Sequence, residues 1–283
     1  MKTRIIVSAV LLPIFFAVLF FFPPYILTGV VSLICAIAAY ELLHATGSNK
    51  NKRILIYTII TAALVPASAY LKTLPAIIFN FQFSIFNLAL LFILTCLLFI
   101  EAILAYKTER QISLQHILIA LFGGIVIPYM LSALINLRIK PEGHLFVLLP
   151  IICAFMTDSG AYFTGVALGK RKAFPNISPG KTIEGCIGGM ITGAAGMIIY
   201  GIILANTTPH TIIFPALVLY GIIGAAVTQL GDLVFSLIKR EYDVKDYGRL
   251  IPGHGGMLDR FDSMTFTAPA MYLLLSAYPA IIV

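Results

Sequence analysis

Charged residues are scarce in this chain of 283 residues: they make up 11%, whereas 60% of the residues are hydrophobic. That composition, with a mean hydropathy of +0.99, excludes a soluble globular protein and a disordered one. The apolar runs also lack the strict alternation that is typical of a membrane β-barrel. Several runs approach or exceed the roughly 20 residues that a helix needs to cross the hydrocarbon. The sequence therefore predicts an all-α, polytopic integral membrane protein.

Cysteine is rare as well, and the arrangement of the cysteines excludes the usual roles. None forms a CxxC pair, and all lie in or at the edge of apolar segments, so we predict neither a zinc site nor a disulfide. The N-terminal apolar run from Ile5 lacks a small-x-small cleavage site before Pro23–Pro24. It is therefore predicted to be a membrane helix and not a cleaved signal peptide. The four cysteines are Cys35, Cys96, Cys153 and Cys186.

We predict about nine transmembrane helices in a single membrane domain, residues 1–283. The sequence shows no convincing internal repeat, and an inverted repeat is hard to build from nine segments, which disfavours a transporter. Residues 1–140 are generic helical scaffold, whereas polar groups and glycines accumulate in the predicted catalytic half, 145–283. The predicted segments are 5–22, 25–44, 54–71, 84–106, 117–136, 144–168, 185–205, 212–237 and 263–282.

The distribution of basic residues predicts the orientation. With the N-terminus in the cytoplasm, sixteen of the nineteen Lys and Arg residues fall in cytoplasmic connections, which is a strong positive-inside signal. The connections 169–184 and 238–262 then face the cytoplasm together. Glu41 and Glu101 are the acids of the scaffold half that lie close to membrane depth, near the cytoplasmic ends of their helices. We interpret them as snorkelling to the headgroups and not as catalytic groups.

Asp158 lies inside the sixth predicted segment, where a carboxylate needs a partner or a water-filled cavity. Small neighbours such as Ser159 and Gly160 fit simple helix–helix packing. Asp158 does not fit it, and we predict a role in the site.

The connection 169–184 carries a second polar group, SPGKT, just before a predicted helix start. A helix N-terminus with free N–H groups beside a lysine and hydroxyls is suited to phosphate. A helix cap is the plainer interpretation, and the two can hold together. A P-loop is rejected because no strand is predicted before GKT and the first glycine is missing. The predicted phosphate-binding residues here are Ser178, Lys181, Thr182 and Glu184.

Ten charged residues fall within the 27 positions from Ser236 to Asp262, which follow the eighth segment. Glycines around a histidine can close their N–H groups on an oxyanion. Carboxylates among basic residues favour Mg²⁺ chemistry on phosphates, because Mg²⁺ takes one or two carboxylates plus substrate oxygens. The plainer alternative, a solvated charged loop, leaves Asp232 inside the eighth segment unexplained. The candidate residues are Asp232, Lys239, Arg240, Lys245, Asp246, His254, Gly255, Gly256, Asp259, Arg260 and Asp262.

This stretch resembles the signature of the phosphatidate cytidylyltransferases, or CDP-diacylglycerol synthases. The resemblance covers about the last half of the chain and extends upstream to Gln229-x-Gly231-Asp232 and to the SPGKT run. The matching signature positions are Ser236, Lys239-Arg240, Lys245-Asp246, Gly248, Pro252, His254-Gly255-Gly256, Asp259-Arg260 and Asp262.

The resemblance implies an integral membrane homodimer that joins CTP and phosphatidate into CDP-diacylglycerol and pyrophosphate. It implies that Asp232 and Asp259 are carboxylate ligands of Mg²⁺, with a second ion, K⁺ or Mg²⁺. We expect no nucleic-acid partner, a location in a bacterial cytoplasmic membrane and a site that faces the cytoplasm. Candidates for the charges of the two substrates are Lys181, Lys239, Arg240 and Arg260, with His254 as a phosphate hydrogen-bond donor.

Two alternative functions remain open. A polyprenol or phytol kinase of related architecture would transfer the γ-phosphoryl group and release no pyrophosphate. A cation-coupled transporter would use Asp158 and Asp232 as an ion path, and it would not need the phosphate-binding loop. An enzyme that consumes CDP-lipid is disfavoured, because its clustered DxxDG motif followed by AR is absent.

Overall fold

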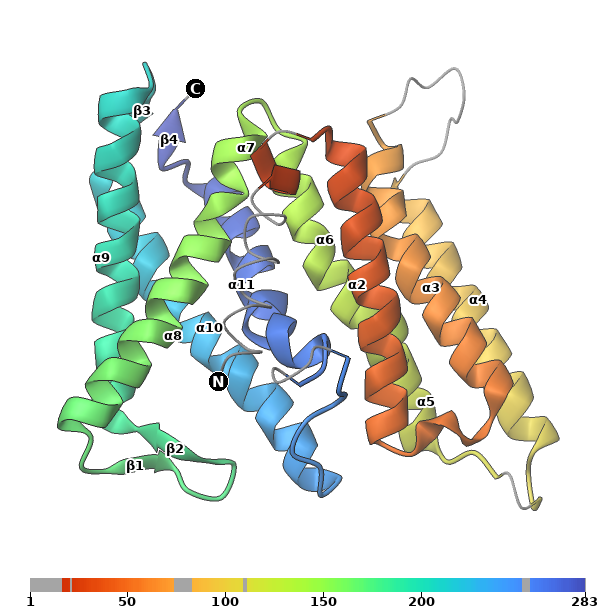
Figure 1. Cartoon of the computed structure of the whole chain (residues 1–283). Helices are drawn as coiled ribbons and strands as arrows, with labels where there is room; N and C mark the ends of the chain where they lie inside the picture. The colour runs from red at the N-terminus through yellow and green to blue at the C-terminus, as the bar shows by residue number, and fades with distance from the viewer. Residues whose placement is uncertain (1–16, 21, 74–82, 109–110, 251–254, 283) are drawn as a thin grey trace. The chain divides into compact units, whose positions relative to one another are not determined.

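A computed structural model describes residues 17–20, 22–73, 83–108, 111–250 and 255–282 (Figure 1). The chain divides into two compact units. Unit 1 comprises Met1–Ile139 and Tyr242–Arg260, and unit 2 comprises Lys140–Glu241 and Phe261–Val283. Part of the charged loop thus groups with the N-terminal residues, and the second boundary falls inside helix α11 (Leu258–Ala277). The single domain with a scaffold half and a catalytic half stays a prediction.

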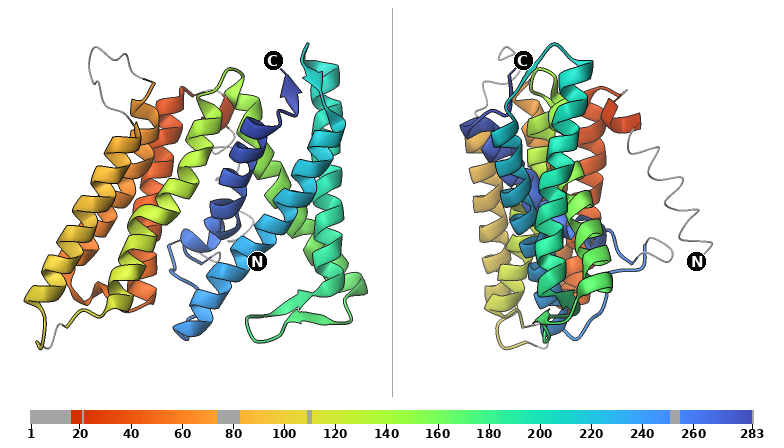
Figure 2. Two further views of the ribbon diagram at one scale, coloured as in Figure 1. Left: turned by 180° about the vertical axis from the view of Figure 1, so that it is seen from behind. Right: turned by 90° about the vertical axis from the view of Figure 1, so that its left-hand side faces the viewer.

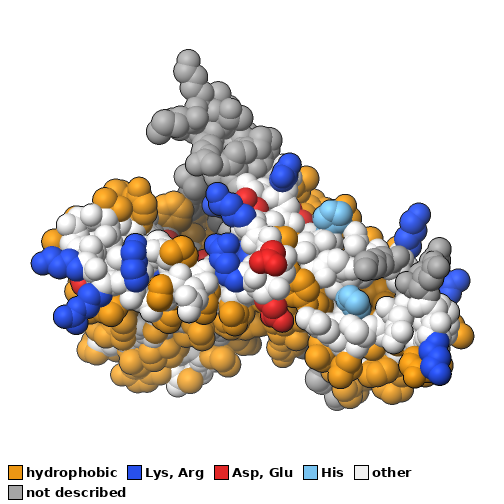
Figure 3. All heavy atoms as spheres, turned by 90° about the horizontal axis from the view of Figure 1, so that it is seen from below, with side chains coloured by type: hydrophobic (Ala, Val, Ile, Leu, Met, Phe, Trp, Pro, Cys, Tyr) orange, Lys and Arg blue, Asp and Glu red, His pale blue; other side chains and the backbone are white. Residues whose placement is uncertain are grey.

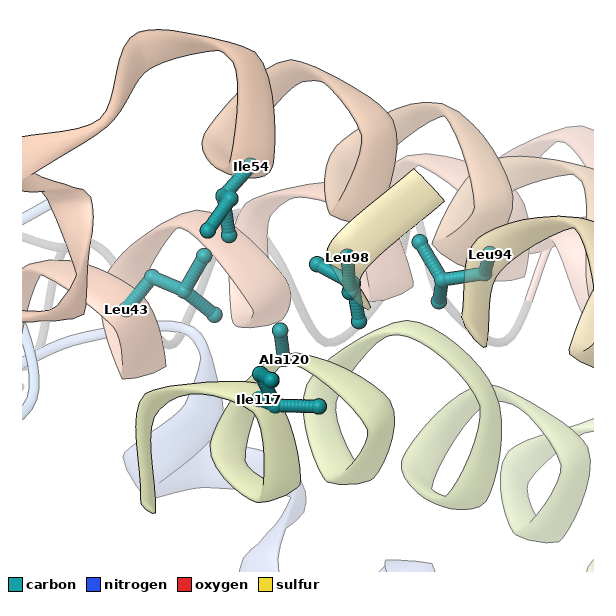
Figure 4. Packing of buried hydrophobic residues seen from close by; sticks show 6 residues of the cluster. All are labelled: Leu43, Ile54, Leu94, Leu98, Ile117 and Ala120. Carbon is teal, nitrogen blue, oxygen red and sulfur yellow. The ribbon is translucent and has the colours of Figure 1, made fainter. Parts of the chain in front are cut away.

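Unit 1 is built of helices that pack on α3. Helix α3 contacts α2, α4 and α6, and a buried cluster forms where α2, α3, α4 and α5 meet. Figure 4 shows six members of this cluster: Leu43, Ile54, Leu94, Leu98, Ile117 and Ala120. The elements are α2 (Pro24–Ala45), the 3₁₀ turn η1 (Ser48–Lys50), α3 (Lys52–Leu71), α4 (Phe83–Leu104), α5 (Leu114–Leu121), the π-helical η2 (Phe122–Val126) and α6 (Ile127–Arg138).

A π-helical segment joins α5 to α6 and has a local cause. Pro128 has no N–H to donate, so the regular α ladder is interrupted there. The N–H of Ile127 bonds instead to the carbonyl of Phe122, five residues back. Gly124 lies within the segment, and a Cβ there would come 3.0 Å from a methyl of Leu94. The wider turn and the glycine therefore let this helix pack closely on its neighbours.

Unit 2 contains four long helical stretches and two short antiparallel strand pairs: the hairpin β1–β2, and β3–β4, whose strands are separated in the sequence by α10 and α11. The strand pairs depart from the all-helical prediction. Their strands are two to five residues long, too short for a period-2 pattern to reveal them. The elements are α7 (Gly143–Phe146), α8 (Leu148–Leu168), β1 (Lys172–Phe174), β2 (Ser178–Thr182), α9 (Ile183–Thr207), β3 (Thr211–Ile212), α10 (Phe214–Glu241), α11 from Phe261 onward, and β4 (Ile281–Ile282).

Glycines hold α8, α9 and α10 in close contact, and Figure 2 shows these helices side by side. A Cβ at Gly160 of α8 would lie 1.8 Å from Thr192 Oγ1 of α9. A Cβ at Gly221 of α10 would lie 2.4 Å from the Cα of Ala194. Because lipid tails are as apolar as leucine, helices in a membrane associate through such close van der Waals packing. The glycines at these helix contacts are therefore packing residues.

Seven helices in the described part of the chain are long and apolar enough to cross a membrane. They correspond to the second through eighth predicted segments. The first segment, 5–22, lies almost wholly outside the described residues, and α11 at the ninth is not apolar enough to be counted, so the number nine stays a prediction. Large apolar side chains face outward on α4, where Phe92 is 67% and Ile103 is 72% exposed. Such side chains are suited to contact with lipid.

Candidate functional site

The β1–β2 hairpin of unit 2 presents Lys181 beside the first turn of α9. Thr182 is the N-cap of that helix, and its Oγ1 accepts the N–H of Gly185 at 3.1 Å. Glu184 fastens the start of the hairpin, because its Oε2 accepts the N–H groups of Lys170 and Arg171 at 3.1 and 3.3 Å. The cap that the sequence predicted is therefore present. Thr182 and Glu184, both predicted to bind substrate, hold the hairpin in shape in this structure.

A close approach of α10 and α11 sets the position of the second group. A Cβ at Gly231 would lie 3.0 Å from the carbonyl oxygen of Asp262 and 3.2 Å from the Cα of Ser263. Only a glycine lets the two backbones come this near. One turn away, the hydroxyls of Thr228 and Thr267 share a buried hydrogen bond of 2.7 Å. Asp262 and Ser263 of α11 are thereby held near Asp232, the residue that follows Gly231.

An ion pair joins the hairpin to α10. Lys181 Nζ lies 2.6 Å from Asp232 Oδ2, and it also donates to the carbonyl of Gln229 at 3.4 Å. The hydroxyl of Ser236 donates to Asp232 Oδ1 at 3.4 Å. The side chains of Lys181 and Asp232 are 21% and 30% exposed, so the pair is shielded but open to a ligand. The lysine of a connection and the carboxylate of a predicted membrane segment thus meet, and the sequence assigned both to one site.

Two further carboxylates interact electrostatically with this pair. Asp158 of α8 interacts electrostatically with Asp232 and Lys181. Asp262, which precedes the ninth predicted segment, interacts with Asp232, Lys239 and Asp158. Burial raises the pKa of Asp262 to about 7, and the neighbouring Asp232 carboxylate adds to that shift. Unit 2 therefore brings together three carboxylates and two lysines that the sequence singled out.

The donor set of this cluster suits a hard cation. Mg²⁺ prefers carboxylate oxygens and takes one or two of them together with substrate oxygens and water. Within the described ranges, no group of three or more His, Cys, Asp or Glu side chains is arranged to hold a metal ion. The Lys181 ammonium lies against Asp232, where it supplies the positive charge. Asp232 and Asp262 fit Mg²⁺ by ligand type.

Basic side chains gather at the hairpin. Figure 3 views the face on which β1 and β2 lie, and several Lys and Arg side chains are spread over it, with hydrophobic side chains along its edges. Arg240, at the end of α10, donates from Nε to the carbonyl of Ile177 in the hairpin at 3.1 Å. This arginine therefore links helix and hairpin, and it lies in the positive region predicted for phosphate.

In unit 1, Asp259 organises the charged loop. Its Oδ2 accepts the N–H of Tyr247 at 2.8 Å and the N–H of Gly256 at 3.1 Å, and the residue is 8% exposed. Gly255 has a φ of +85°, a backbone conformation that residues with a side chain rarely adopt. The glycine N–H that was predicted to meet a phosphate oxyanion meets the Asp259 carboxylate in this structure.

The interpretation of Glu41 and Glu101 as snorkelling residues is wrong. Glu41 is 4% and Glu101 is 7% exposed. Glu41 accepts the N–H groups of Met257 and Leu258 at 3.0 and 2.8 Å, and Glu101 pairs with Arg53 at 3.2 Å. Both carboxylates are satisfied inside unit 1. No local signal in the sequence links Glu41 to partners more than 200 residues away.

A cavity of about 1020 Å³ lies in unit 1 between α2 and residues 244–250. Ala36, Ile37 and Ile59 give it an apolar wall, while Lys245 and Arg249 contribute basic groups. Asp246 and Glu41 line it as well. Apolar wall and basic groups together suit an amphiphilic anion.

The predicted site residues thus fall into two sets. Those brought together in unit 2 are Asp158, Lys181, Asp232, Lys239 and Asp262. Those of the unit 1 loop are Lys245, Asp246, Gly255, Gly256, Asp259 and the exposed Arg260. Asp232 and Asp259 belong to different units, so their shared metal centre stays a prediction. His254 lies outside the described residues.

Comparison with known proteins agrees with the motif. The sequence model of the cytidylyltransferase family matches residues 2–278. A phosphatidate cytidylyltransferase of Bacillus subtilis is 43% identical over 136 residues, 48% of this chain and 49% of that protein. One of Haemophilus influenzae is 40% identical over 170 residues, 58% and 59% of the two chains. One of Thermotoga maritima is 30% identical over 287 residues, 100% and 98%. The match spans about half of the Bacillus relative and nearly all of the Thermotoga one.

Proposed function

Because this chain belongs to the cytidylyltransferase family, we propose that it transfers a cytidylyl group from CTP to phosphatidate. An oxygen of the phosphatidate phosphate attacks the α-phosphorus of CTP. The bond from that phosphorus to the bridging oxygen of the β-phosphate breaks, and pyrophosphate leaves. The products are CDP-diacylglycerol and pyrophosphate. The observation that carries the proposal is the Lys181–Asp232 ion pair beside Asp158 and Asp262.

The chemistry asks for charge neutralisation more than for a strong base. The phosphomonoester of phosphatidate is already anionic near neutral pH, so no group of the chain has to remove a proton first. Two polyanions must nevertheless approach each other, which fixed positive groups favour. Lys181, Lys239 and Arg240 supply such groups at the hairpin end of unit 2. A triphosphate can draw Lys181 away from Asp232 and so expose that carboxylate.

We propose that Asp232, with Asp259 or Asp262, holds Mg²⁺, as the donor types and the family resemblance support. Bound Mg²⁺ would stabilise negative charge on the phosphate oxygens during displacement. Asp232 orients Lys181, and Asp259 holds the backbone N–H groups of Tyr247 and Gly256. A second ion, K⁺ or Mg²⁺, and a homodimer complete the proposal.

The activity test uses purified protein in detergent–lipid micelles with CTP, phosphatidate and Mg²⁺. We expect CDP-diacylglycerol and pyrophosphate in equal amounts, no product with ATP in place of CTP, and none after Mg²⁺ is chelated. Formation of a phosphorylated lipid and CDP, without pyrophosphate, would indicate a lipid kinase and overturn the proposal. Omission of K⁺ tests the second ion, because turnover should fall only if K⁺ is that ion.

We further propose that the connections 169–184 and 238–262 face the cytoplasm of a bacterial inner membrane. The charge distribution supports this orientation. Single cysteines at the exposed Asn176 and Leu250, in a variant without native cysteines, should react with an impermeant maleimide in inverted vesicles only. A cysteine at Lys72, which follows the third predicted segment and so falls in a connection on the opposite face, should react in right-side-out vesicles. Labelling of Asn176 or Leu250 from the outer face would contradict the orientation.

A further inference from the structure

Glu41 binds the first turn of α11 although it lies on α2, in the half of the chain with no catalytic motif. Its Oε1 accepts the N–H of Met257 at 3.0 Å, and its Oε2 accepts the N–H of Leu258 at 2.8 Å. A helix N-terminus favours negative charge, and its first N–H groups have no partner within the helix. Each carboxylate oxygen thus has its own donor, and the side chain is 4% exposed.

Two glycines of the charged loop, Gly248 and Gly256, lie against this carboxylate. A Cβ at Gly248 would lie 2.3 Å from Glu41 Oε1, and a Cβ at Gly256 would lie 2.6 Å from Oε2. Any larger residue at either position would push the carboxylate away from its donors. The two glycines leave the space that the Glu41 carboxylate occupies. A loop that was merely solvated would need neither the glycines nor the buried carboxylate.

Asp259 directly follows Leu258 and binds the same loop as Glu41. Its Oδ2 accepts the N–H groups of Tyr247 and Gly256. The Glu41 and Asp259 carboxylates also repel each other electrostatically. Two buried carboxylates near one loop are unfavourable unless hydrogen bonds compensate them. Here four backbone N–H groups do so: those of Met257 and Leu258 bind Glu41, and those of Tyr247 and Gly256 bind Asp259.

We propose that Glu41 is a positioning residue for cytidylyl transfer, which fixes the backbone of Met257 and Leu258 and so the direction of the Asp259 carboxylate. The inference rests on the proposed function. It gives the N-terminal half of the chain a defined part in catalysis through an acid whose two oxygens are held by backbone N–H groups. We expect the loss of Glu41 to lower kcat and to leave KM nearly unchanged. A displaced Asp259 carboxylate lowers the rate without removing a group that binds CTP or lipid.

The decisive variant is Glu41→Gln, which keeps the size but turns one acceptor into an amide donor that faces an N–H group. We expect kcat per folded protein to fall by about 10- to 100-fold, with KM for CTP and phosphatidate within about twofold of the wild type. The matched control is Glu101→Gln, an equally buried carboxylate of unit 1 that binds Arg53 and Asn51. It should keep kcat within about twofold. If Glu41→Gln does not fold, Glu41→Asp, which keeps the charge but shortens the reach, should give an intermediate kcat.

Hydrogen exchange supplies a readout that needs no activity. We expect amides at Tyr247 and Gly256–Leu258 to exchange faster in Glu41→Gln, and at wild-type rates in Glu101→Gln. Faster exchange with unchanged kcat would make Glu41 a structural residue and overturn the proposal, and so would unchanged exchange and kcat. If the wild-type protein fails to make CDP-diacylglycerol, the proposed function fails. The exchange comparison still decides whether Glu41 fixes the loop.

Discussion

Replacing Asp232 with Asn is expected to lower cytidylyl transfer by about 10³-fold, the largest effect we expect in unit 2. The amide preserves the shape of the side chain but removes the charge that lies 2.6 Å from Lys181 Nζ. It also removes the carboxylate that we propose as a Mg²⁺ ligand. The variant should insert and fold, because a carboxylate near membrane depth is itself costly. The measurement is kcat/KM per folded protein at saturating Mg²⁺.

Lys181→Met is the comparison that separates the two members of this pair. It removes the cation but leaves Asp232 in place, so we expect a raised KM for CTP with a smaller loss of kcat. Near-native transfer by Asp232→Asn would show that Asp232 only holds the hairpin through Lys181. If both variants lost kcat/KM to the same extent, and only through a raised KM, Asp232 would also not be a metal ligand.

The helices were predictable because their signal is local. Uninterrupted apolar runs identify a membrane helix almost without regard to the rest of the chain, so α2, α3 and α4 begin and end within a few residues of the predicted segments. The ends of α11 were harder to predict, because Asp259, Arg260 and Asp262 make its first turns polar. The β1–β2 hairpin escaped notice because its three-residue first strand leaves no periodic pattern.

Candidate site residues were predictable where an ionisable side chain lies in an otherwise apolar segment. An aspartate such as Asp158 or Asp232 within an apolar run has few structural uses, so its presence alone indicates a site. The roles of hydrogen-bonded groups were not predictable in this way. Thr182 and Glu184 satisfy backbone N–H groups of the hairpin and of α9, and Glu41 does the same for α11. Such contacts depend on where the backbone passes, which the residue types do not encode.

Replacing Asp259 with Asn should abolish cytidylyl transfer while leaving the loop intact. In this structure Asp259 Oδ2 accepts two N–H groups, from Tyr247 and Gly256. A neutral amide oxygen can accept both, so the backbone contacts survive. The charge does not, and with it goes the second carboxylate that the family resemblance assigns to the metal. We expect a loss of about 10³-fold in kcat, with hydrogen exchange of the loop close to that of the wild type.

Asp259→Ala separates the role of Asp259 as a hydrogen-bond acceptor for the loop from the role of its negative charge. It removes the acceptor as well as the charge, so the amides of Tyr247 and Gly256 should exchange faster, and a buried, unsatisfied N–H costs about 1–3 kcal/mol. Both variants should be inactive, but only the alanine variant should loosen the loop. If Asp259→Asn kept near-native transfer with an ordered loop, Asp259 would act by hydrogen bonding alone. The metal carboxylates would then have to be sought in unit 2, with Asp262 beside Asp232 as the next pair to test.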